Sequence, residues 1–98
     1  MRMMMKVQIP VAAGNEAIRN GSLEKAIEGT MERVQPEAAY FTVEDGVRTA
    51  LFFFDLGDQS QMPVIGEPLF MAFDAQIDMT PCMNGDDLRK GLAAWGGA

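Results

Sequence analysis

The amino-acid sequence predicts a single α+β domain, in which a four-stranded antiparallel sheet carries both long helices on one face. Three observations favour this fold class. The chain has 98 residues, a length that suits one domain. Strand-like and helix-like segments follow in the order strand, helix, strand, strand, helix, strand, and an Asp-Gly turn joins the two middle strands. We expect one domain over residues 1–98, with a C-terminal helix and tail over residues 83–98.

Four segments predict the strands. Met3–Ile9 alternates apolar and polar residues, as does a strand with one buried face. Ala38–Val43 and Arg48–Asp55 flank the Asp-Gly turn, and Ala75–Met83 supplies the last strand. This order of elements resembles the ferredoxin-like split βαβ pattern, and with two right-handed crossovers the resemblance implies the strand order 4-1-3-2.

Three segments predict helices. A stripe of apolar residues at helical spacing begins at the expected N-cap Ser22, after a short helical lead-in over residues 15–20. Asp58–Phe73 predicts the second helix, which Pro68 should kink or shorten. Asn84 opens a short terminal helix, whose apolar residues are spaced to pack on a surface.

The hairpin register sorts the strand residues into two faces, since a two-residue loop fixes which residues pair. The face expected under the helices carries Met5, Val7, Ile9, Phe41, Val43, Ala50, Phe52, Phe54, Ile77 and Met79. The opposite face carries Lys6, Gln8, Tyr40, Thr42, Thr49, Leu51, Phe53, Gln76, Asp78 and Thr80. A slip of one residue in the turn would exchange the two faces of the hairpin.

The second face predicts a homodimer. Met4, Tyr40, Leu51 and Phe53 form an apolar patch that a monomer would leave in water. The same face of a second copy would cover this patch by isologous pairing.

Composition excludes several classes of function. The 14 acidic and 8 basic residues give a net charge of −6, which disfavours binding to nucleic acid and to anionic membranes. The chain has no histidine, so an imidazole base and a histidine-ligated metal are excluded. The single cysteine, Cys82, cannot form an internal disulfide. The sequence shows no signal peptide or membrane span, so we expect a cytoplasmic protein. Because histidine is absent and cysteine occurs once, we also expect no metal or cofactor.

The order of elements over Met3–Met83 resembles the ferredoxin-like split βαβ pattern and the dimeric α+β barrel superfamily. That superfamily includes antibiotic-biosynthesis monooxygenases, muconolactone isomerases and YCII-related proteins. Ile9–Asn15, Pro36–Phe41 and Asp86–Leu92 also resemble small bacterial members with no assigned function. The resemblance implies two sheets packed face to face, with sites between sheet and helices or inside the barrel. Several members use a histidine that this chain lacks, so their mechanisms do not carry over.

Few side chains on the second face could carry chemistry. Asp78 and Lys6 lie on neighbouring strands and point the same way, so they are the candidate catalytic residues for proton transfer. The alternative is a cross-strand ion pair with a structural role. The candidate ligand-binding residues are Gln8, Tyr40, Thr42, Thr49, Phe53 and Gln76.

Two functions fit these residues. The first is binding or transformation of a small, partly apolar organic molecule in a cleft near the sheet, without metal or nucleotide. The alternative is a non-catalytic module of the same fold that binds a ligand or a protein. An RNA-recognition function is disfavoured, because the third strand lacks the expected Gly-aromatic signature and the chain is acidic.

Overall fold

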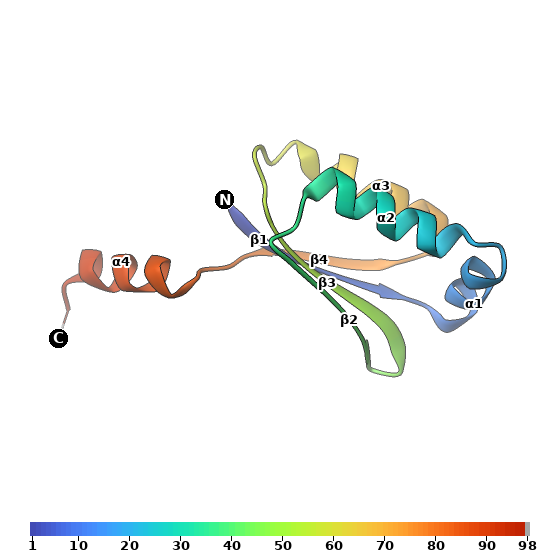
Figure 1. The fold of residues 1–98 in the computed structure, drawn as a ribbon. Coiled ribbons are helices and arrows are strands. Elements are labelled where there is room, and N and C mark those ends of the chain that lie inside the picture. The colour runs from blue at the N-terminus through green and yellow to red at the C-terminus, as the bar shows by residue number, and fades with distance from the viewer. Residues whose placement is uncertain (98) are drawn as a thin grey trace.

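In the computed structural model, which describes residues 1–97, three helices cover one face of a four-stranded antiparallel sheet, and a fourth helix extends past its end (Figure 1). The elements are β1 (Arg2–Ile9), α1 (Val11–Arg19), α2 (Ser22–Val34), β2 (Ala38–Glu44), β3 (Val47–Asp55), α3 (Gln61–Phe73), β4 (Gln76–Pro81) and α4 (Gly85–Trp95). The α+β class predicted from the sequence is confirmed.

The sheet has the order β2-β3-β1-β4, which becomes 4-1-3-2 when it is counted from the β4 edge. Asp45 and Gly46 both have positive φ, at 56° and 78°, and they form the two-residue loop between β2 and β3. The loop pairs Val43 with Arg48 and Tyr40 with Leu51, so the hairpin register is confirmed.

The core lies between the sheet and α1–α3. Alternate residues of β1, from Met3 to Ile9, are buried, because successive strand residues point to opposite faces. Phe52 and Phe54 of β3 and Phe73 of α3 are at most 2% exposed. Phe53, between the two buried phenylalanines, points to the other face and is half-buried.

The prediction that Phe41 and Val43 are buried is wrong. Their exposed fractions are 54% and 70%. The reason is that β2 is an edge strand, and Figure 1 shows the hairpin end of β2 and β3 bending away from the helices. The Phe41 ring keeps one core contact, an edge-to-face packing on Phe52 with ring centres 6.0 Å apart.

Several boundaries differ from the predictions, and the first helix, expected over residues 15–20, spans Val11–Arg19. Ser22 is not an N-cap: Gly21 holds that position with φ of 77°, and the Ser22 amide donates to the Asn20 side chain at 2.9 Å. The second long helix begins at Gln61, because Asp58 accepts the Ser60 amide at 3.0 Å in a turn before the helix. The last strand ends at Pro81 rather than two residues later.

Pro68 does not shorten α3, which continues to Phe73. Proline has no amide hydrogen, so the carbonyl of Val64, four residues earlier, loses its helical partner. The Arg33 Nη1 of α2 donates to this carbonyl at 2.8 Å. A side chain from the neighbouring helix therefore replaces the hydrogen bond that Pro68 cannot make.

Candidate functional site

The predicted site residues lie together on the sheet face away from α1–α3, which we call the open face. Pairing between strands puts Asp78, Lys6, Leu51 and Tyr40 in one row across the sheet. The next row consists of Gln76, Gln8, Thr49 and Thr42. Phe53 and Met4 pair in the row on the other side of Lys6. The register therefore gathers residues from all four strands on one surface.

The Lys6 ammonium binds Glu44 rather than Asp78. Lys6 and Asp78 are direct partners along β1 and β4, but the Lys6 Nζ lies 2.9 Å from the Glu44 Oε1. The hydrogen bond to Glu44 is the main cause that raises the pKa of Lys6 above its ordinary value, with smaller contributions from Asp45 and Asp78. Lys6 therefore stays protonated in neutral solution, and the exposed Asp78 carboxylate faces solvent.

Gln8 and Thr49 are engaged in hydrogen bonds within the sheet. The Gln8 Nε2 donates to the Glu44 carbonyl at 3.3 Å and to the Thr49 Oγ1 at 3.4 Å. The Thr49 hydroxyl donates to the Val47 carbonyl at 3.1 Å, and the residue is 3% exposed. These contacts fix both side chains in place, so a ligand on the open face would meet Thr42 and Gln76 more readily.

The open face also carries an apolar patch, made of Met4, Tyr40, Leu51 and Phe53. Tyr40 is 62% exposed, and the other three side chains are half-buried among their strand neighbours. Figure 1 shows α1–α3 on the opposite side of the sheet, so none of these helices covers the patch.

A pocket of about 270 Å³ lies between α2 and the sheet, on the helix side. We call it the inner pocket. Its walls come from α2 and from three strands, β1, β2 and β3. The lining residues are Val7, Ile9, Leu23, Ile27, Phe41, Thr42, Arg48, Thr49 and Ala50. The lining is almost entirely apolar, and Arg48 is the only charged residue in it.

Arg48 is held at the inner pocket by α1. The Arg48 Nη2 donates to the Asn15 Oδ1 at 3.0 Å, and the Nη1 donates to the Val11 carbonyl at 3.5 Å. Gly14 makes this approach possible, because a Cβ at that position would lie 2.6 Å from the Arg48 Nη1. None of the carboxylates of residues 1–97 makes an ion pair with this guanidinium.

Of these lining residues, only Thr42 and Thr49 are among the candidate residues predicted from the sequence. Leu23 and Ile27 are one helical turn apart, and both were assigned to the apolar stripe of the helix. The position of Phe41 on an edge strand is the signal that could have revealed the inner pocket. The helices cover the centre of the sheet, so an apolar side chain on the helix side of an edge strand is left partly uncovered beside them.

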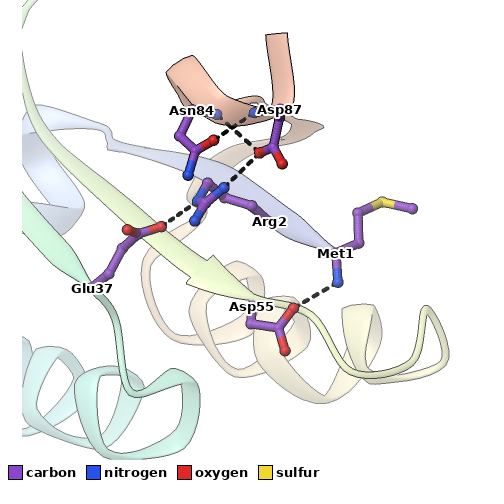
Figure 2. A network of polar contacts seen from close by, with 6 residues as sticks. All are labelled: Met1, Arg2, Glu37, Asp55, Asn84 and Asp87. Atoms are coloured by element: carbon purple, nitrogen blue, oxygen red, sulfur yellow. Dashed lines mark hydrogen bonds and ion pairs between the residues drawn. The ribbon is translucent and has the colours of Figure 1, made fainter. Parts of the chain in front are cut away.

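A second group of polar residues ties α4 to the end of the sheet (Figure 2). The Arg2 Nε lies 2.6 Å from the Glu37 Oε1, and the Arg2 Nη1 lies 2.8 Å from the Asp87 Oδ2. The hydrogen bond to Glu37 raises the pKa of Arg2 further above its ordinary value. Asn84 and Asp87 form a capping box, in which each side chain accepts the backbone amide of the other.

An open hollow of about 750 Å³ adjoins this group, and its lining includes the half-buried Cys82. No set of three acidic or thiol side chains among residues 1–97 is arranged to hold a metal ion. Within the same range, no helix has both the length and the apolar character needed to cross a membrane. No protein-family model and no curated protein matches this chain.

Proposed function

We propose that this chain is a ligand-binding module with a ferredoxin-like fold, and that it binds a small, mainly apolar organic molecule in the inner pocket. The observation that carries the proposal is the continuous apolar lining between α2 and the edge of the sheet. Its volume of about 270 Å³ is close to the lower end of the range for ligand pockets, roughly 300–1,000 Å³. The ligand is therefore a compact molecule, of the size of one or two fused rings.

The chemistry of the lining favours binding over catalysis. Arg48 is its one charged residue, and the side chains of the two threonines that line it, Thr42 and Thr49, belong to the open face. A guanidinium keeps its proton under all physiological conditions, so Arg48 is suited to orient a polar end of the ligand rather than to exchange protons. Asp78 and Lys6, the candidate catalytic pair, lie on the opposite face of the sheet. Neither metal nor nucleotide is required for the binding that we propose.

We further propose that the functional form is a homodimer in which the open faces of two copies pack together, as in the dimeric α+β barrel superfamily. The apolar patch supports this pairing, because its four side chains are contiguous across β1, β2 and β3. The ion pair between Lys6 and Glu44 neutralises part of this face, which lowers the cost of bringing two acidic chains together.

Amide NMR spectra recorded with increasing indole, a compact apolar probe, test the binding proposal. We expect shifts centred on the amides of Ile27, Thr42 and Ala50. Phe41→Ser removes an apolar wall and should weaken indole binding by tenfold or more. Val43→Ser is the matched control, because Val43 is an exposed neighbour on the same strand that does not line the inner pocket. Shifts confined to the open face, or equal binding by the two variants, would contradict the proposal.

A further inference from the structure

Helix α4 carries an apolar surface that nothing in its own chain covers. Leu88, Leu92 and Trp95 are 48%, 56% and 67% exposed, and no residue of α4 is buried. Their spacing of four and then three residues puts the three side chains on one side of the helix. We call this surface the α4 stripe. A helix held in water with such a stripe uncovered is typical of an element that packs on a second molecule.

The α4 helix is held in a direction that keeps the stripe away from its own sheet. The Cys82 amide donates to the Arg2 carbonyl at 3.1 Å, which extends the pairing of β4 beyond Pro81. Only Met83 separates Cys82 from the N-cap Asn84, and Arg2 binds the first turn of α4 through Asp87. Figure 1 shows that α4 then continues away from the sheet, and Figure 2 shows the contacts that hold its first turn.

We propose that the α4 stripe packs against a second copy of this chain, so that each copy of the homodimer holds the other with its C-terminal helix. This inference rests on the homodimer proposed above and adds a second contact to it. In this pairing one twofold operation covers two apolar surfaces, the open-face patch and the α4 stripe. Arg2 binds the first turn of α4 through Asp87 and lies two residues from Met4 on β1, so the α4 stripe begins at the end of the sheet that carries Met4.

The size of the two surfaces supports this pairing. At about 4.8 Å between strands and 3.3 Å per residue, the open face projects to roughly 400 Å². The 11 residues of α4, at about 1.5 Å each and about 10 Å across, add roughly 160 Å². A stable interface buries about 800 Å² of accessible surface per partner, and accessible surface exceeds projected area because side chains stand out from it. Together the two surfaces project to roughly 560 Å², so the helix raises the area available for pairing by about two fifths over that of the sheet face alone.

The charge of α4 is compatible with a copy of this chain and disfavours an anionic membrane. Asp86 and Asp87 are balanced by Arg89 and Lys90, so the helix has no net charge. A partner with a net charge of −6 is therefore not repelled by it. A helix that binds anionic membranes has a strongly basic polar face, which α4 lacks.

Trp95 provides the test, because it is the only tryptophan of the chain. We expect its fluorescence emission to be blue-shifted, and protected from acrylamide quenching, at concentrations where light scattering gives the mass of a dimer. On dilution to the monomer, the emission should move to the red over the same concentration range. Leu92→Glu, in the middle of the α4 stripe, should raise the dimer dissociation constant at least tenfold. Ala93→Glu adds the same charge next to the stripe and should change the constant less than twofold.

Each other outcome overturns the inference in a recognisable way. A dimer in which Trp95 has the emission of a water-exposed indole would remove the role of α4 and leave the open-face pairing intact. A blue-shifted emission that persists in the diluted monomer would mean that α4 packs on its own chain. A blue shift that appears only with anionic phospholipid vesicles would assign the stripe to a membrane. A monomer at all concentrations, with Trp95 exposed, would overturn both the pairing and the α4 contact.

Discussion

The hydrogen bond from Arg33 to the Val64 carbonyl predicts a coupling between Arg33 and Pro68. Arg33→Met removes the guanidinium and keeps an unbranched side chain of similar reach. A hydrogen bond from a charged donor contributes about 1.5–3 kcal/mol to stability when it is shielded from water. Val64 is 45% exposed, so water can partly replace the donor. We therefore expect Arg33→Met to lower the free energy of unfolding by about 1 kcal/mol.

The double-mutant cycle with Pro68→Ala isolates this contribution. Alanine at position 68 restores an amide that can donate to the Val64 carbonyl, so the guanidinium is no longer needed there. In that background Arg33→Met should cost close to nothing, which gives a coupling energy of about 1 kcal/mol. Urea unfolding of all four proteins at one protein concentration measures it. Arg19→Met, on the exposed surface of α1, is the control and should change little in either background. An equal cost of Arg33→Met in both backgrounds would refute the reasoning.

Two further predictions concern glycines and pH. Gly46→Ala should destabilise the protein by about 1 kcal/mol, since φ of 78° is strained for any residue with a Cβ. Gly29→Ala should instead stabilise the protein by about 0.5–1 kcal/mol, because Gly29 is helical and an added Cβ would meet open space. Thermal unfolding separates the two, and equal changes would contradict the φ assignment. Hydrogen bonds from the following turn hold the pKa of Asp58 below its ordinary 3.8. The contribution of Asp58 to the free energy of unfolding is therefore present above pH 3.8, and it is lost as the pH falls through the lower pKa of the folded state. Asp58→Asn should remove the loss of stability that this titration causes, which is measured as the change of the urea midpoint with pH.

The features that the sequence predicted well are set by local chemistry. Asp45 and Gly46 tolerate positive φ, and a two-residue loop then fixes the pairing of all the residues on either side of it. Alternation of apolar and polar residues identified the buried face of β1, because the side chains of a strand point alternately to its two faces. Asn84 was identified as the start of the last helix, since its side chain can accept an amide of the first turn.

The features that the sequence did not predict depend on distances between elements. Register placed Lys6 beside Asp78, but a lysine side chain can reach across a neighbouring strand, and its ammonium binds Glu44 of β2 instead. The inner pocket depends on the gap between α2 and an edge strand, and no local pattern measures such a gap. Arg33 supports Pro68 from another helix, so the continuity of α3 past the proline is a tertiary effect.

The two surfaces proposed for ligand and partner lie on opposite faces of one sheet, which makes them separable by experiment. Phe53 points to the open face and Phe41 to the helix side. We expect Phe53→Asp to dissociate the homodimer in light scattering and to leave indole affinity within about twofold of the parent, because the walls of the inner pocket come from one chain. Phe41→Ser should show the reverse pattern. Met71→Asp, at an exposed position of α3 on the other side of the sheet, is the charge control and should leave the dimer intact.

Thr42 and Thr49 line the inner pocket and also lie in a row of the open face, so a coupling between the two surfaces is expected to involve them. Thermodynamic linkage requires such coupling to be reciprocal, so indole would then change the dimer dissociation constant by the same factor by which dimerisation changes indole affinity. Thr49 is buried and hydrogen-bonded in the sheet, which opposes movement there. We therefore expect a factor near one in both directions. If Phe53→Asp remains a dimer, the assignment of the open face is wrong. If each titration instead gives the same large factor, both surface assignments stand and the strands between the two surfaces move.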